Sequence, residues 1–214
     1  MELLVTVCAW LGLGVLLLGV TGRLLWAWRA ARIEGSVLPV MSARYGLRSL
    51  VHWLLPLSTR NQRLHPVVTL VSYLFHLCLL LAPLLVAGHV ELWRQRWGFG
   101  WPTLPDPVID VMTLVVMVAV LFFLLRRLAA PEVRNVTGWK EYLLLMVVVA
   151  PFVTGIIAHL HLLDYRLVMV LHIVSGTLWL VLIPFSWLSH MFWFFFTRSY
   201  MGSEFGAVRN ARDW

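Results

Sequence analysis

The sequence predicts an all-α fold, an integral membrane bundle of five helices, from its composition, its long apolar stretches and its basic residues. Hydrophobic residues make up 61% of the 214 residues and charged residues only 13%. Soluble domains average roughly 45–50% apolar and about 25% charged residues. This composition excludes an ordinary soluble domain, and it is too apolar for a disordered chain.

Five apolar stretches are each long enough to cross about 30 Å of hydrocarbon, which takes about 20 helical residues. A transmembrane barrel would need strands of alternating polarity, which these stretches lack. The first stretch is too long for a signal peptide, and only Glu2 and no base precedes it, so we expect a retained helix. We expect residues 1–214 to form a single membrane domain with spans over roughly 3–28, 66–90, 108–125, 142–163 and 167–196.

The basic residues set the expected orientation, because cytoplasmic loops carry an excess of Arg and Lys. Of the 17 basic residues, fourteen fall on one predicted side of the membrane and three on the other. We therefore expect the N-terminus outside and the C-terminus in the cytoplasm. The net charge of +7 is then a topology signal and does not indicate nucleic-acid binding. The three bases on the outer side are Arg94, Arg96 and Arg166.

Residues 42–57 mix Arg with Leu and Trp between the first two spans. This pattern is typical of a short helix lying on the membrane surface, here the cytoplasmic one. Docking of a partner protein on the same segment fits the pattern equally well.

The eight histidines are the main candidates for chemistry, because polar groups inside bilayer helices are costly and are functional suspects. No Asp or Glu lies near the middle of any span, which argues against an ion-coupled transporter. Cys8 and Cys78 form no CxxC motif, which excludes covalent c-type haem and an iron–sulfur cluster held by this chain alone. Neutral imidazoles in an apolar bundle suit haem iron.

His172 and His190 are 18 residues apart in the fifth span. In a continuous helix they share one face and lie about 27 Å apart, so each sits near one membrane surface. The simpler alternative is that both are buried and make hydrogen bonds between helices.

The second span supplies a partner for each of these histidines. His76 matches the depth of His190 and forms the predicted inner pair, and His89 matches His172 and forms the predicted outer pair. The 13-residue spacing from His76 to His89 leaves them about 140° apart around a straight helix. His65 is the alternative ligand, because it lies only about 20° from His76.

Two prolines bear on this choice. His65 directly precedes Pro66, a natural first helical residue, which places His65 at the membrane interface. Pro83 lies between His76 and His89 and can kink the helix. Depth therefore favours His89.

Several motifs resemble the gamma subunit of respiratory nitrate reductase. HIVSGTLWLVLIPFSWLSH over 172–190 resembles the last span of that subunit, and LLRRLAAPEVRNVTGWKEYLLL over 124–145 resembles the turn between its third and fourth spans. Leu74-Phe75-His76 and Gly88-His89 resemble its ligand helix. The resemblance covers roughly residues 65–195.

The resemblance implies a dihaem cytochrome b subunit in a bacterial inner (cytoplasmic) membrane. Two haem b groups would be held by His76 with His190 and by His89 with His172. The subunit would anchor a respiratory complex and carry electrons across the membrane between menaquinol or menaquinone and a cytoplasmic iron–sulfur subunit, in either direction.

The loop after the first span is longer and more basic than in nitrate reductase itself. We therefore expect a relative from the transmembrane redox complexes of sulfate reducers and other anaerobes, with a heterodisulfide reductase-like partner. A periplasmic multihaem cytochrome c is a further expected partner. The cytoplasmic partner would dock on Arg44, Arg48, Arg60 and the C-terminal tail.

Weaker signals complete the prediction. His159, His161 and Arg126 are candidate contacts for quinone or haem propionates, although solvated histidines and a topology-setting Arg are the simpler interpretations. His52 is expected on the surface. The competing functions are a cofactor-free membrane anchor and a histidine-lined metal transporter.

Overall fold

The structure, a computed structural model, describes residues 2–214, and within them every regular element is a helix. Five helices are long and apolar enough to cross a membrane, which confirms the all-α, multi-pass fold class. Their bounds are α1 Glu2–Glu34, α4 Pro66–Leu85, α6 Asp106–Ala129, α8 Trp139–His159 and α9 Tyr165–Leu182.

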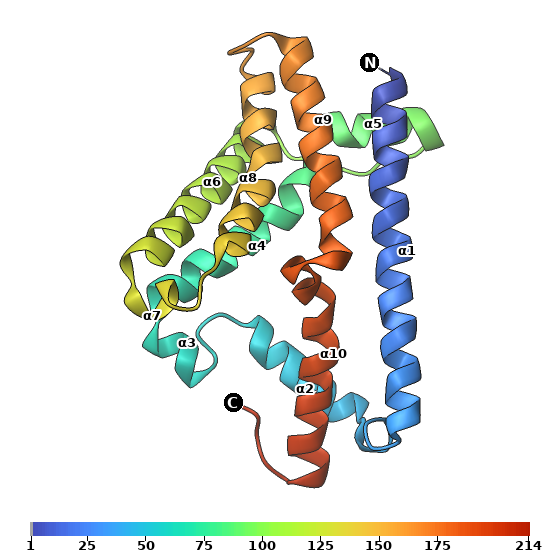
Figure 1. The fold of residues 1–214 in the computed structure, drawn as a ribbon, viewed down its shortest axis with the longest axis vertical. Helices are drawn as coiled ribbons and strands as arrows, with labels where there is room; N and C mark the ends of the chain where they lie inside the picture. Colours follow the sequence, from blue (N-terminus) through green and yellow to red (C-terminus); the bar gives the residue numbers. More distant parts are fainter. Residues whose placement is uncertain (1) are drawn as a thin grey trace. The chain divides into compact units, whose positions relative to one another are not determined.

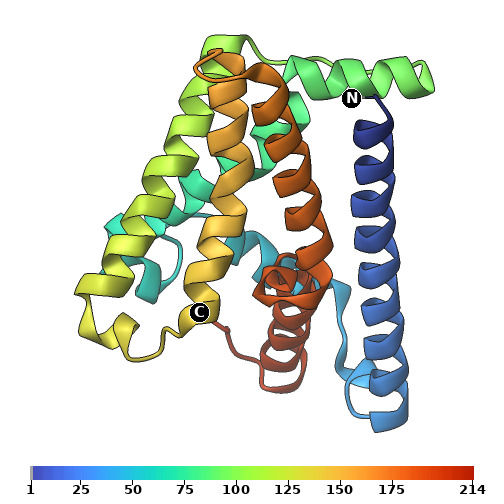
Figure 2. The same cartoon turned by 45° about the horizontal axis from the view of Figure 1, so that its top comes forward.

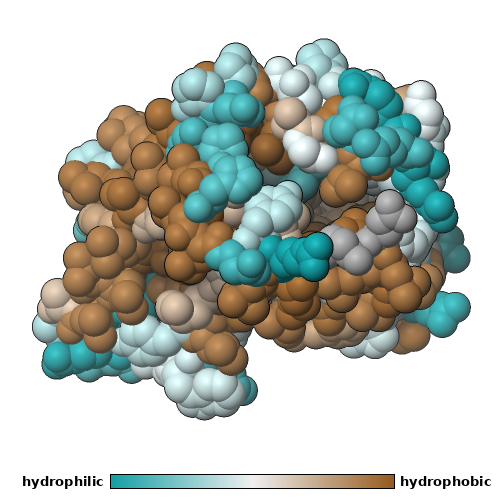
Figure 3. Space-filling model, turned by 90° about the horizontal axis from the view of Figure 1, so that it is seen from above, coloured by the Kyte–Doolittle hydropathy of each residue, from teal (hydrophilic) through white to brown (hydrophobic). Residues whose placement is uncertain are grey.

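The surface of these helices is apolar to an extent that only a lipid environment explains. Leu18 is 78% exposed on α1 and Val118 is 65% exposed on α6. Figure 3 shows hydrophobic residues over much of the face that it presents. A soluble protein seldom exposes apolar patches of this extent. The chain is therefore a multi-pass membrane protein.

The chain divides into two compact units. The first comprises residues 2–5 and Leu70–Gly176, and the second comprises Thr6–Thr69 and Thr177–Trp214. In the first unit α6 and α8 pack side by side, joined by the short helix α7 Pro131–Arg134 (Figure 1). The helix α5 Ala87–Trp97 runs across the direction of α8 and α9 (Figure 2).

The second unit contains most of α1 and two helices in close contact, α2 Ala43–Leu54 and α10 His190–Ser203. Glycines permit this approach: a methyl group at Gly202 would lie 2.4 Å from Cβ of Ser49. The helix predicted over 42–57 is confirmed as α2. His52 is half-buried rather than on the surface, because its ring stacks on Trp214 at 4.0 Å.

Short elements complete the second unit. The helix α3 Arg60–Leu64 begins at a capping box, in which Thr59 accepts from the Gln62 backbone N–H and the Gln62 side chain accepts from that of Thr59. The remaining turns of helix are Leu38–Val40, Ile183–Phe185, Trp187–Ser189 and Glu204–Val208.

The fifth predicted span is wrong as one continuous helix over 167–196. α9 ends at Leu182, and the backbone at Ser186 is extended, with φ −126° and ψ −174°. Pro184 lacks the N–H that a continuing helix needs. His172 therefore lies on α9 and His190 begins α10, so the predicted shared helix face does not exist.

The second predicted span, 66–90, is also two helices. α4 ends at Leu85, Val86 is extended with φ −70° and ψ 131°, and α5 starts at Ala87. The other predicted bounds shift by a few residues: α1 continues to Glu34, α6 fills Asp106–Ala129, and α8 ends at His159 instead of residue 163.

Candidate functional site

His89 and His172 lie face to face within the first unit. Their ring centroids are 5.9 Å apart and their planes are inclined by 30°. His89 comes from α5 and His172 from α9, so the pair joins two elements that are more than 80 residues apart in the sequence. The structure thus brings together the two residues of the predicted outer pair.

The break between α4 and α5 places His89. The last four carbonyls of a helix have no partner inside it. Each of the last four carbonyls of α4 accepts a hydrogen bond from a group outside the helix. The His89 Nδ1–H donates to Pro83 O at 2.8 Å, and the Trp101 indole N–H donates to Leu84 O at 2.7 Å. The carbonyls of Ala82 and Leu85 accept from the backbone N–H groups of Val86 and Leu104.

This arrangement removes the objection that His76 and His89 face different directions on one helix. Because α4 ends at Leu85, the 140° separation expected for a straight helix does not apply to His89. His89 is oriented by a carbonyl at the break itself.

α8 orients His172. The His172 Nδ1–H donates to the carbonyl of Pro151 at 2.9 Å, and the Thr154 hydroxyl lies 3.3 Å from the same nitrogen. Gly155 provides room for the ring, since a methyl group there would lie 3.2 Å from Cε1 of His172. The imidazole is therefore seated against the backbone of α8.

His76 and His190 are oriented in the same manner by nearby carbonyls, His76 by one in its own helix and His190 by one in the short turn before α10. The His76 Nδ1–H donates to the carbonyl of Ser72, one turn earlier on α4, at 2.7 Å. The His190 Nδ1–H donates to the carbonyl of Trp187 at 2.9 Å. His76 belongs to the first unit and His190 to the second, and their pairing stays a prediction.

All four predicted ligands thus share one hydrogen-bond pattern. A carbonyl oxygen can only accept, so in each ring Nδ1 carries the proton, and in the neutral imidazole the lone pair is on Nε2. Histidines that bind metals in proteins are usually fixed in this way by a second hydrogen bond. Within residues 2–214, His52, His65, His159 and His161 have no ring hydrogen bond to a carbonyl.

The rings of His89 and His172 are near neighbours in the first unit, with centroids 5.9 Å apart. No group of three or more His, Cys, Asp or Glu side chains within residues 2–214 could hold a metal ion by itself. Haem requires only two protein ligands, because the porphyrin supplies four nitrogens.

The weaker candidates lie in other places. His65 is exposed between α3 and α4 and belongs to the second unit. His161 is exposed in the turn after α8, with its ring 5.4 Å from that of Tyr165. His159 Nε2 lies 3.6 Å from a carboxylate oxygen of Asp110, which the sequence reasoning did not connect with it.

Arg126 lies in the last turn of α6, at the other end of that helix from Asp110. One turn earlier, Phe123 packs edge-to-face on Phe75, which in turn contacts the ring of His76. Arg126 is therefore at the end of α6 that lies near His76, whereas His159 contacts the opposite end of α6.

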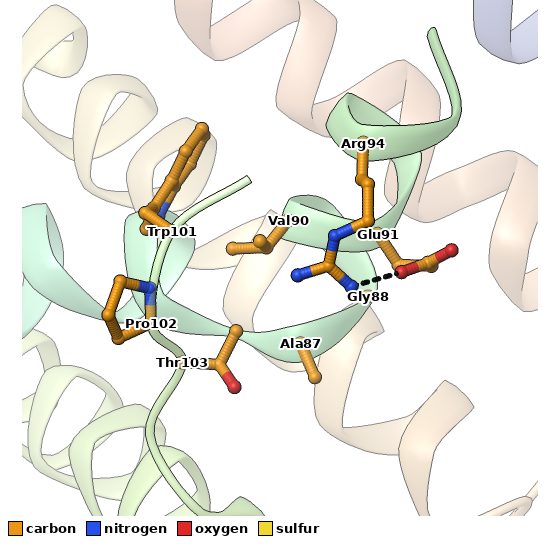
Figure 4. A pocket seen from close by; sticks show the side chains of 8 residues that line it. All are labelled: Ala87, Gly88, Val90, Glu91, Arg94, Trp101, Pro102 and Thr103. Carbon is orange, nitrogen blue, oxygen red and sulfur yellow. Dashed lines mark hydrogen bonds and ion pairs between the residues drawn. The ribbon is translucent and has the colours of Figure 1, made fainter. Parts of the chain in front are cut away.

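A pocket of about 500 Å³ lies between α5 and the loop that follows it (Figure 4). The Arg94 guanidinium and the Glu91 carboxylate form an ion pair at 2.9 Å in its wall. Trp101 forms the opposite wall and is fixed there by its bond to Leu84. Its remaining walls come from Ala87, Gly88, Val90, Pro102 and Thr103.

Sequence reasoning missed Pro151, Thr154 and Gly155, which contact the ring of His172, and Trp101, which closes the end of α4. Prolines carried a partial signal, because Pro83 and Pro151 each provide a carbonyl to a ligand histidine and Pro184 lies at the second break. Trp101 had no signal, since its bond depends on how the loop after α5 folds back.

No protein-family model and no solved structure matches the chain. A protein of Nitratidesulfovibrio vulgaris, named only "Protein", is 35% identical to it over 205 residues. The match covers 94% of this chain and 91% of that protein, so the two are homologous over nearly their full length. The name of the relative states no activity, ligand or partner.

Proposed function

The chain belongs to the family of this Nitratidesulfovibrio vulgaris protein, and we propose that it is a dihaem cytochrome b subunit that anchors a redox complex in a bacterial inner membrane. It carries electrons between quinol or quinone and a cytoplasmic iron–sulfur subunit. In this proposal its N-terminus lies outside and its C-terminus in the cytoplasm, as the distribution of basic residues predicts.

One observation carries the proposal: the four histidines chosen from the sequence all donate Nδ1–H to a backbone carbonyl, at 2.7–2.9 Å. This bond holds each ring in one orientation and leaves the lone pair on Nε2, the nitrogen that would ligate iron. His89 and His172 would hold one haem b, and His76 and His190 the other. Haem, when bound, would supply a one-electron redox centre.

The pocket on α5 is the quinone site in this proposal, on the same helix as His89. Arg94 can donate a hydrogen bond to a quinone oxygen, and the Glu91 carboxylate can accept a proton from quinol. The Trp101 ring offers a flat apolar wall for an aromatic head group. Five of the eight lining residues and His89 belong to α5, which begins directly after the α4–α5 break.

A reduced-minus-oxidised spectrum of the purified protein, with pyridine haemochrome quantitation, tests the proposal. We expect b-type absorbance and two haems per chain. A cofactor-free anchor would show no b-type absorbance. A metal transporter would bind divalent ions and would also show no b-type absorbance. Absence of haem from protein purified from its native membrane would overturn the proposal.

A further inference from the structure

The break between α9 and α10 is held by the first helix, which sequence reasoning treated only as a membrane span. The guanidinium of Arg23 on α1 donates a hydrogen bond to the carbonyl of Pro184 at 2.5 Å. Gly19, one turn earlier on α1, lies so close to Pro184 that a methyl group there would be 2.7 Å from its Cγ. Both contacts lie within the second unit.

The contacts of Gly19 and Arg23, together with a third contact at Gly12, lie on one face of α1. Gly12 packs against Leu180, where a methyl group would lie 3.1 Å from a Leu180 methyl carbon. Positions 12, 19 and 23 fall within about 40° of one another around a helix. In contrast, methyl groups at Gly14 and Gly22 would meet nothing within 4 Å in residues 2–214. α1 therefore approaches the break closely on this face.

The Arg23 contact has a clear physical reason. An extended residue at Ser186 interrupts the helix, so the carbonyl of Pro184 needs a donor from outside it. An ionisable side chain within a membrane span is itself costly unless it is paired. The hydrogen bond satisfies both groups in the same place.

Arg23 also reaches the far side of the break. Its guanidinium lies 5.8 Å from the ring centroid of Trp193, on the first turn of α10. Trp193 is three residues after His190, and Pro184 is six residues before it. Arg23 thus contacts the chain on both sides of His190.

We propose that Gly19 and Arg23 are positioning residues for His190. By holding both sides of the break, they fix the direction in which α10 leaves α9 and so the direction of the His190 imidazole. α1 is then a structural part of the inner ligand site. This inference rests on the proposed function, because it takes His190 as a haem ligand.

The test uses full-length variants purified in detergent. Arg23→Gln removes the charge and Arg23→Lys keeps it, and Arg29→Gln is the control on the same helix. Gly19→Ala introduces the close methyl group, and Gly22→Ala is its control in open space. The readouts are haem per chain, the spectrum and midpoint potential of each haem, and hydrogen exchange over residues 183–193.

We expect Arg23→Gln and Gly19→Ala to perturb the haem component that is lost in His190→Ala, with the other component unchanged. Exchange over 183–193 should rise about tenfold, as expected for the loss of one hydrogen bond. Arg23→Lys should restore most of the parental behaviour, and both controls should match the parent. Parental haem components together with parental exchange in both test variants would overturn the inference.

The exchange measurement separates this inference from the proposed function. If the parent protein binds no haem, the proposed function fails, and with it the role of His190 as a ligand. If haem is bound and exchange rises in the test variants while both haem components stay parental, the break is held by α1 but does not position a ligand, and the inference alone fails.

Discussion

The imidazoles of His89 and His172 stack with centroids 5.9 Å apart, although each ring takes its orientation from a different helix. His89 is held by the carbonyl of Pro83 at the end of α4, and His172 by the carbonyl of Pro151 within α8. Two independent hydrogen bonds thus hold the two rings. Such preorganisation would reduce the cost of binding the haem that we propose.

The two candidates for the fourth ligand can be separated by substitution. His89→Ala should reduce haem to about half of the parental content, because one of the two proposed haem sites would lose a ligand. His65→Ala should leave the haem content unchanged, since His65 is exposed between α3 and α4. Pyridine haemochrome quantitation of both variants decides between them. The reverse pattern would assign the ligand to His65.

Gly155→Ala tests whether the seat of His172 on α8 matters. The added methyl group would lie 3.2 Å from Cε1 and 3.4 Å from Nδ1 of His172, so the ring must shift by a few tenths of an ångström. We expect an altered electron paramagnetic resonance signal of one low-spin haem, with weakened retention of that haem during purification.

The helix itself should not suffer from this change, because Ala is more favourable than Gly inside a helix by roughly 0.5–1 kcal/mol. Gly14→Ala is the matched control, since a methyl group there meets nothing within 4 Å in the described residues. Identical resonance signals in the parent and in Gly155→Ala would show that His172 is not held at this position.

The sequence was sufficient for the spans but not for the two breaks in them. Hydropathy located five membrane-crossing segments because lipid selects for long apolar runs. Hydropathy does not report helix continuity, since Leu85-Val86-Ala87 and Ile183-Pro184-Phe185 are as apolar as a helix interior. The breaks depend on donors from distant residues, Trp101 and Arg23, that satisfy the exposed carbonyls.

The preference for His89 over His65, which stays a prediction, rests on matching depth. Matching depth selected His89, although a straight helix would have turned it away from His76. The break at Val86 removes that conflict, and only the folded chain could reveal it. The roles of Gly155 and Thr154 were equally inaccessible, because they depend on the packing of α8 against α9.

Arg94→Gln tests the pocket on α5 as a quinone site. The Arg94–Glu91 ion pair is about half exposed, and such pairs contribute about 0–1 kcal/mol, so the fold should be unaffected. Loss of one hydrogen bond from a charged group should raise the KM for a quinol analogue roughly tenfold. Rapid-mixing reduction of the bound haem by the analogue measures this.

Arg96→Gln is the control for the pocket, because Arg96 is on the same helix but does not line it. Haem content should stay parental in both variants. An unchanged KM in Arg94→Gln would exclude Arg94 from the quinone site, whereas equal effects of both substitutions would indicate a general effect of surface charge.

Trp101→Phe tests the hydrogen bond that closes the end of α4. Phe retains the ring but loses the indole N–H, so the carbonyl of Leu84 loses its donor. The expected loss is about 1 kcal/mol in the free energy of unfolding, with faster hydrogen exchange over residues 84–90.

Trp26→Phe is the control for Trp101→Phe. Residue 26 is 71% exposed, so this substitution should change neither the free energy of unfolding nor the exchange. Because His89 lies within residues 84–90, the proposed function also predicts weaker haem retention in Trp101→Phe. A Trp101→Phe protein with parental exchange over 84–90 would show that the break is stable without the indole bond, and that the Pro83 carbonyl and the Leu104 amide are enough to hold it.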